Sequence, residues 1–144
     1  MGVYEARLVP VMAEVLLGLG VKKALVVHGD DGMDEISLTG KTSIAEIRNG
    51  MVKRYTVAPE DFGFKRCVLE DLQCSSKEKS KEAAIGVLKG AVGAKTEIVC
   101  LNAGAALYAA EKAPSIHDGI NMAKGVLDRG AALKKLDQMA GFSE

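Results

Sequence analysis

The first third of the chain changes from helical to strand-like spacing of its apolar positions. Within residues 5–19 apolar side chains recur every three or four positions, which predicts an amphipathic helix, and Gly20 is placed to end it. Residues 22–27 then include four consecutive apolar side chains, from Ala24 to Val27, and predict a short strand. Because no polar positions alternate within this run, we expect the strand to be buried on both faces, as in a parallel sheet.

A hairpin is predicted next. Asn49-Gly50 is the dipeptide preferred in two-residue type I′ turns, in which both residues have positive φ. Residues 43–48 before it form a short β-like run, and residues 51–57 after it alternate between two faces. These segments therefore predict a pair of antiparallel strands.

The second half of the chain carries helical patterns separated by polar breaks. Residues 64–76 look irregular. Residues 75–88 predict a helix, and the charged residues at its start are expected to face water. Residues 96–113 are apolar almost all round, which is typical of a helix buried in a core. Asn102 lies in the centre of this run, and because a buried amide needs partners we expect it to belong to a structural network. Cys100 lies in the same run and is expected to pack rather than react.

Two further helices complete the predicted elements. Ser115 is placed as the N-cap of a helix that ends at Gly130, and apolar positions between 133 and 139 continue into a short last helix. The elements together predict an α/β fold, with helices packed on a partial parallel or mixed sheet that carries a β-hairpin. The helices outnumber the strands that they could cover. We therefore expect residues 1–144 to be a single α/β domain that is incomplete.

Composition and charge exclude several classes of protein. The 144 residues carry 19 basic and 19 acidic side chains, so the formal net charge is zero, whereas nucleic-acid binders usually have a basic excess. Aromatic residues make up only 4% and Trp is absent, which argues against a stacking surface for single strands. Three cysteines without C-x-x-C spacing indicate neither a disulfide framework nor a zinc site. Since no apolar stretch is long enough to span a bilayer, we expect a cytoplasmic protein without membrane contacts.

The strongest candidate for chemistry is the polar loop that follows the strand at residues 22–27. Asp34 and Glu35 are adjacent carboxylates in this loop, at the end of the strand where open α/β sheets place their ligands. Gly29 and Gly32 allow the backbone to approach a ligand closely. Since Asp30 and Asp31 add negative charge, the loop would repel a bare phosphate unless a cation stood between them. The pair could also be two surface charges in a turn, but it has the hard oxygen donors that a Mg²⁺ bridging to diphosphate needs.

The remaining polar candidates have simpler structural interpretations. His28 follows the strand directly and could contact a ligand, although a partly buried histidine bonded to a loop carbonyl is the favoured interpretation. His117 is expected at the surface, in the first turn of a helix. No Ser or Cys has an evident base partner, so the sequence assigns no catalytic residue, and it leaves the substrate-binding residues unknown.

These residues together resemble the anthranilate phosphoribosyltransferases of tryptophan biosynthesis. The most specific part is His28-Gly29 followed by Gly32 and Asp34-Glu35, because the related pyrimidine nucleoside phosphorylases lack the acidic pair. The similarity covers nearly the whole chain and includes residues 2–4, 12–16, 24–29, 32–40, 59–63, 101–103 and 105–108.

The resemblance implies a transferase that moves the phosphoribosyl group of phosphoribosyl diphosphate to the amine of anthranilate and releases diphosphate. It implies Mg²⁺ as cofactor, with Asp34 and Glu35 at the positions that bind the metal. It also implies a fold like the C-terminal domain shared by nucleoside phosphorylases and phosphoribosyltransferases, and a homodimer for the complete enzyme.

The chain also departs from this family. The Gly-Thr-Gly-Gly-Asp phosphate loop, the Lys-His-Gly-Asn-Arg segment, the arginine that contacts anthranilate and the N-terminal helical domain are absent from the sequence. The chain therefore matches the carboxyl-terminal part of such an enzyme. Two alternatives stay open: a catalytically inert binding or interaction module that lacks the substrate loops, and a nucleoside phosphorylase-like relative.

Overall fold

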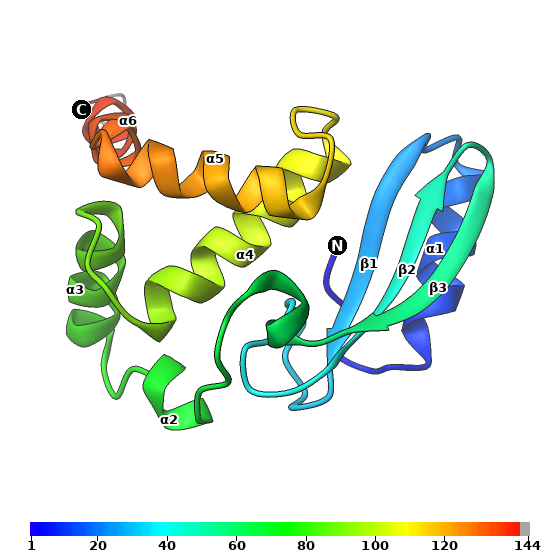
Figure 1. The fold of residues 1–144 in the computed structure, drawn as a ribbon, viewed down its shortest axis with the longest axis horizontal. Coiled ribbons are helices and arrows are strands. Elements are labelled where there is room, and N and C mark those ends of the chain that lie inside the picture. Colours follow the sequence, from blue (N-terminus) through cyan, green and yellow to red (C-terminus); the bar gives the residue numbers. More distant parts are fainter. Residues whose placement is uncertain (142–144) are drawn as a thin grey trace.

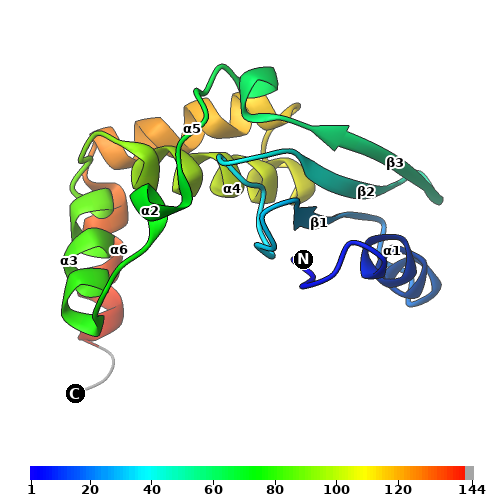
Figure 2. The ribbon, with the colours of Figure 1, turned by 90° about the horizontal axis from the view of Figure 1, so that it is seen from below.

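A three-stranded sheet lies between one N-terminal helix and a group of C-terminal helices (Figure 1). The computed structural model describes residues 1–141. In chain order the elements are α1 (Leu8–Gly18), β1 (Lys23–Gly29), β2 (Thr42–Arg48), β3 (Met51–Val57), the 3-10 helix η1 (Pro59–Phe62), α2 (Leu69–Leu72), α3 (Lys77–Leu88), α4 (Ala94–Ala109), α5 (Ile116–Asp128) and α6 (Ala131–Ala140). In both ribbon views α3 and α6 lie at the end of the molecule far from the sheet (Figures 1 and 2).

Strand β1 is buried on both faces, as its uninterrupted apolar run predicts. Leu25 and Val27 point into the larger core cluster, where they meet Leu101 and Ala105 of α4. Val26 points to the opposite face and belongs to a second cluster that α1 closes. Figure 2 shows the sheet between these two layers. Side chains alternate between the faces of a strand, so a helix on each face is enough to require apolar residues at every position.

The parallel pairing predicted for this strand is wrong. The three strands pair in the order β1-β2-β3, and β1 runs antiparallel to β2, with Val26 opposite Ala45. A parallel contact occurs only as an isolated bridge between Gly2 and Val27 on the other edge of β1, within the part of the chain that the structure describes. Burial on both faces reflects what covers a sheet and not the direction of the neighbouring strand. This is why the apolar run predicted the burial correctly and the pairing incorrectly.

The predicted hairpin is confirmed. Strands β2 and β3 pair antiparallel with Arg48 opposite Met51. Asn49 and Gly50 between them have φ of 53° and 74°, the two positive values that a type I′ turn requires.

Helices α4 and α5 cross at a pair of glycines. A Cβ atom on Gly104 would lie 2.5 Å from the backbone nitrogen of Ile120, and one on Gly119 would lie 2.2 Å from the carbonyl oxygen of Gly104. Only hydrogen atoms fit at this contact, so the two helices approach each other backbone to backbone. The close crossing brings Ile120 into the core beside Leu101.

The expectation that residues 96–113 are buried all round is wrong. The helix there is α4, which ends at Ala109, and one of its sides is open. Val99 is 44% exposed, and Ala106 and Ala110 are also exposed. These residues line an apolar groove of about 510 Å³ between α4 and α5. An apolar pattern shows which side chains favour burial, but it does not show that other residues of this chain bury them.

The other helices are close to their predicted positions. Ser115 and Ser76 are the N-caps of α5 and α3, and each side-chain oxygen accepts a backbone N–H of the first turn. The charged start of α3 is exposed, and Cys100 is buried in the core. The short helix α2 lies within residues 64–76, which were expected to be irregular. Of the helices in residues 1–141, none is both long and apolar enough to cross a membrane.

Candidate functional site

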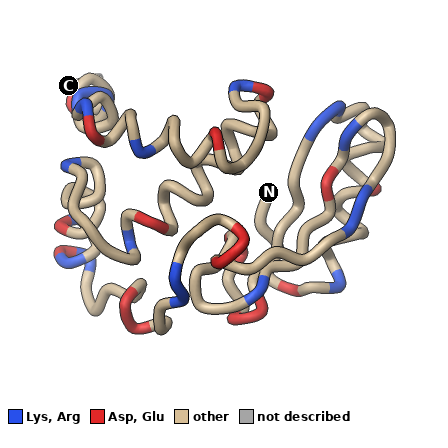
Figure 3. The backbone as a smooth tube through the Cα atoms, viewed as in Figure 1, with Lys and Arg blue, Asp and Glu red and all other residues tan. Residues whose placement is uncertain are grey.

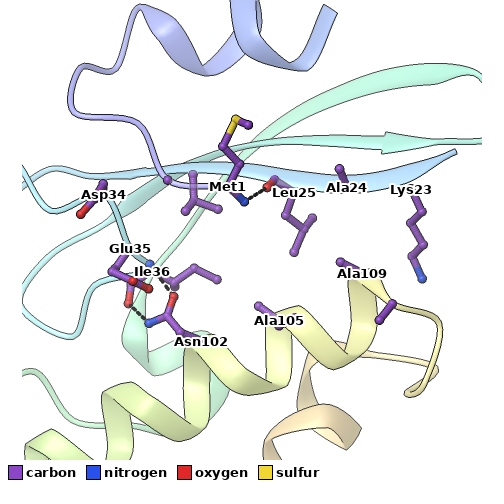
Figure 4. A pocket seen from close by; sticks show the side chains of 14 residues that line it. Met1, Lys23, Ala24, Leu25, Asp34, Glu35, Ile36, Asn102, Ala105 and Ala109 are labelled. Carbon is purple, nitrogen blue, oxygen red and sulfur yellow. Dashed lines mark hydrogen bonds between the residues drawn. The ribbon is translucent and has the colours of Figure 1, made fainter. Parts of the chain in front are cut away.

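The loop after β1 places Asp34 and Glu35 at one end of an open pocket (Figure 4). The pocket has a volume of about 580 Å³ and lies between β1, the N-terminal residues and α4. Both carboxylate residues are exposed, whereas Ile36 directly after them is buried. The predicted metal-binding residues therefore both line the pocket and are exposed, on a loop whose next residue is buried in the core.

The electrostatics of this pair favour a cation. Although Glu35 is exposed, neighbouring protein atoms displace part of the water around its carboxyl group and so raise its pKa, and the negative charge of Asp34 raises the pKa further. Both causes disfavour a second negative charge beside the first. A bound cation would remove that cost, so metal binding is expected to compete with protonation of Glu35 and to weaken as the pH falls. Within residues 1–141 no three His, Cys, Asp or Glu side chains gather as a metal site. A Mg²⁺ ion held through two carboxylates would therefore need water and phosphate oxygens for its other positions, which is the usual arrangement for this ion.

Asp31 has a different role from the one suggested by its place in the sequence. Its carboxylate accepts hydrogen bonds from the hydroxyl groups of Ser37 (2.6 Å) and Thr39 (2.5 Å) and from the backbone N–H of Met33 (3.0 Å). These contacts join the two ends of the loop. Burial would raise the pKa of Asp31, but the three hydrogen bonds outweigh it and hold the pKa below its ordinary value. The Asp31 carboxylate is thus used to hold the loop together, and it is less exposed than Asp34 and Glu35.

We expect Asp31→Asn to destabilise the protein by about 1 to 2 kcal/mol at neutral pH, because hydrogen bonds to a charged acceptor are lost or weakened. The effect should depend on pH. A carboxyl whose pKa is lowered in the folded state stabilises fully above its unfolded value, here 3.8, and stops doing so as the pH falls through the lower folded value. The difference in urea unfolding free energy between wild type and variant should therefore shrink in acid. A difference that stays constant with pH would contradict this role, and Asp137→Asn, at an exposed position of α6, serves as the control.

Asn102 fixes the residue that follows the acidic pair. Its side-chain oxygen Oδ1 accepts the backbone N–H of Ile36 at 2.9 Å, and its Nδ2 donates to the carbonyl oxygen of Ile36 at 2.9 Å. Nδ2 also donates to the carbonyl oxygen of Ile98 at 3.1 Å. The structural network predicted for this amide is confirmed. Its partner 66 positions away could not be found from the sequence.

The two histidines have the structural roles favoured by the sequence. The Nδ1 atom of His28 lies 2.8 Å from the carbonyl oxygen of Val3, and the ring is buried. His117 is exposed, and its Nε2 lies 2.9 Å from the carbonyl oxygen of Asp61. Neither ring lines the pocket beside Asp34.

A polar cluster that was not predicted ties α4 to the sheet. The hydroxyl of Tyr108 donates to Oε1 of Glu46 at 2.6 Å, and the hydroxyl of Tyr55 donates to Oε2 at 3.1 Å. Burial and the neighbouring Glu46 carboxylate raise the pKa of both tyrosines, so their hydroxyls remain protonated donors. The ammonium of Lys23 stands 3.7 Å above the Tyr108 ring. The cluster fixes α4, and with it Asn102, relative to β2.

Comparison with known proteins identifies the family. The sequence model described as glycosyl transferase family, a/b domain, matches residues 1–133. The chain belongs to this family. The anthranilate phosphoribosyltransferase of Clostridium beijerinckii is 46% identical over 142 residues, which are 99% of this chain and 42% of that relative. The resemblance to anthranilate phosphoribosyltransferases is thereby confirmed for a chain that spans about two fifths of the length of its curated relatives.

Solved members of the family share the fold. The crystal structure of anthranilate phosphoribosyltransferase (TrpD) from Thermus thermophilus matches with a TM-score of 0.87 and 37% identity, covering 98% of this chain and 41% of that chain. The enzyme from Saccharomyces cerevisiae, solved in complex with PRPP and Mg, matches with a TM-score of 0.81 over 94% of this chain and 40% of that chain. At 24% identity the second likeness shows the fold alone.

Proposed function

We propose that this chain is the C-terminal part of an anthranilate phosphoribosyltransferase and that Asp34 and Glu35 hold the Mg²⁺ ion that binds the diphosphate of phosphoribosyl diphosphate. The observation that carries the proposal is the position of this pair. Both residues are exposed and line the pocket, on a loop that hydrogen bonds of Asp31 and Asn102 fix on either side of the pair. Relatives that are 46% identical to the chain bear this enzyme's name.

The proposed reaction needs little covalent chemistry from this part of the protein. The bond between C1 of the ribose and the diphosphate oxygen breaks, the anthranilate nitrogen bonds to C1, and diphosphate leaves with the bonding electrons. Negative charge grows on the leaving diphosphate, and a bound Mg²⁺ would stabilise it as a Lewis acid. Asp34 and Glu35 would hold that ion and orient it. No nucleophilic side chain is required, which agrees with the absence of an assigned catalytic residue in the sequence.

The composition of the surface supports a small-molecule substrate. Acidic and basic positions are both spread along the chain in short clusters of one sign, such as the acidic residues within 30–35, and neither sign covers the whole tube in Figure 3. A surface of mixed charge lacks the basic patch by which proteins bind nucleic acids. We therefore propose phosphoribosyl diphosphate and anthranilate as the ligands of the complete enzyme, and we retain a homodimer as its proposed assembly.

A graft provides a direct test. The matching region of the Clostridium beijerinckii relative, which is 42% of its length, is replaced by this chain. We expect the folded graft to release diphosphate from phosphoribosyl diphosphate in a reaction that requires both anthranilate and Mg²⁺. A folded graft that is inactive while the parent enzyme is active would contradict the proposal and favour an inert interaction module.

The same graft distinguishes the phosphorylase alternative. Phosphate-dependent cleavage of a pyrimidine nucleoside, without any reaction of phosphoribosyl diphosphate, would favour a nucleoside phosphorylase. The acidic pair argues against that outcome, because inorganic phosphate needs less charge neutralisation than a diphosphate does.

A further inference from the structure

The amide of Asn102 binds both backbone hydrogen-bonding groups of a single residue in a distant loop. Ile36 donates its N–H to Oδ1 and accepts from Nδ2, each at 2.9 Å (Figure 4). The peptide group that joins Glu35 to Ile36 contains the first of these bonds. A rotation of this peptide would break the bond, so the amide fixes the direction in which the chain leaves Glu35.

Asn102 is itself held firmly. Its third hydrogen bond reaches the carbonyl oxygen of Ile98, one turn earlier on α4. Six residues after it on the same helix, Tyr108 is hydrogen-bonded to Glu46 of β2. The side chain of Ile36 is only 2% exposed and packs in the larger core cluster. The contact with the loop thus starts from a rigid helix and ends on a buried residue.

We propose that Asn102 is a positioning residue for the Asp34-Glu35 pair: it acts through the Ile36 backbone and thereby sets the affinity of the pair for a metal–diphosphate complex. This inference rests on the proposed function of the pair. Residues that do not touch the metal but hydrogen-bond to its ligands and orient them typically contribute a factor of about 10 to 100 in metal affinity. A merely structural amide would change the stability of the fold and leave the affinity of the folded protein as it was.

The first test measures binding of Mn²⁺ together with inorganic diphosphate to the 144-residue chain, by electron paramagnetic resonance. We expect Asn102→Ala to weaken binding by about 10-fold or more at a temperature where circular dichroism shows it folded. The matched control is Asn121→Ala, at an exposed position of α5, which should bind as wild type does. A folded Asn102→Ala protein with wild-type affinity would overturn the positioning role.

A second measurement uses the wild-type chain and does not depend on a variant that folds. Because coupling between two sites is reciprocal, a contact that favours binding must be strengthened by binding. Addition of Mg²⁺ and inorganic diphosphate should therefore slow hydrogen exchange of the Ile36 amide, the donor to Asn102, more than that of Ile44 in the middle of β2. Equal exchange of Ile36 with and without the ligands would overturn the proposal.

The two proposals can fail separately. Asp34→Asn with Glu35→Gln should abolish Mn²⁺–diphosphate binding. If the double variant loses binding while folded Asn102→Ala retains it, the metal role of the pair stands and the role of Asn102 is wrong. If the double variant binds as tightly as wild type, the proposed metal site is wrong. If the wild-type chain and the folded graft both fail to bind, both proposals are wrong.

Discussion

Replacing Asp34 by Asn and Glu35 by Gln in the active graft is expected to lower kcat/KM by on the order of 100-fold or more. A metal that stabilises the leaving group contributes several kcal/mol to the transition state, and each 1.4 kcal/mol corresponds to about a factor of ten in rate. The amide side chains have nearly the same size as the carboxylates, and both positions are exposed, so the fold should persist. The decrease in kcat/KM therefore measures the effect of removing the two negative charges. Initial rates measured over a range of Mg²⁺ concentrations give the result.

The dependence on Mg²⁺ distinguishes a metal role from a general effect of charge. In the double variant the half-saturating Mg²⁺ concentration should rise steeply. Glu70→Gln with Asp71→Asn is a suitable control, because it removes another adjacent acidic pair, at exposed positions of α2. The control should retain wild-type rates and wild-type Mg²⁺ dependence. Unchanged Mg²⁺ dependence in the Asp34 and Glu35 variant would remove the metal role from this pair.

Gly104→Ala is expected to be among the most damaging single substitutions for stability, at about 2 to 3 kcal/mol. The new Cβ would lie 2.5 Å from the Ile120 nitrogen and 2.7 Å from its Cγ1 atom. The nitrogen belongs to the backbone of α5 and cannot rotate away, so the two helices must separate. Alanine favours a helix over glycine by up to about 1 kcal/mol, which offsets part of the cost. For a chain of this length the midpoint of thermal unfolding should fall by roughly 5 to 10 °C.

Gly18→Ala is the matched control for this prediction. Gly18 is also helical, at the end of α1, and a Cβ there would meet nothing within 4 Å. The same substitution should therefore leave stability unchanged or raise it slightly. If Gly104→Ala unfolds at the same temperature as Gly18→Ala, the close helix crossing does not exist in solution.

The local elements were predictable because their signals are local. Asn49-Gly50 predicted a turn that depends only on the φ angles of two residues, and Ser115 predicted a cap that satisfies a backbone N–H three positions away. The acidic pair could be singled out for the same reason: two hard donors adjacent in sequence remain adjacent in any fold. The direction in which β1 pairs has no such signal, since it depends on which segment returns beside it.

The contacts that fix the position of the site cannot be predicted from sequence patterns. Asp31 and Asp34 have the same side chain in the same loop, yet Asp31 accepts hydrogen bonds from Ser37 and Thr39 and Asp34 lines the pocket. The partner of Asn102 lies 66 positions earlier in the chain. A buried amide indicates that a partner exists, because leaving it unpaired is costly, but the identity of the partner depends on the packing of α4.

The sequence by itself determined the local elements, the two-sided burial of β1, the family and the pair of carboxylates on which the proposed chemistry rests. These follow from the spacing of apolar positions and from residue types next to each other in the chain. Only the tertiary structure decided that the sheet is antiparallel, that α4 keeps an open apolar side and that Asn102 holds the backbone beside Glu35. The physical reason is that these features depend on contacts between segments far apart in the chain, whose energies are decided by three-dimensional packing and not by local spacing.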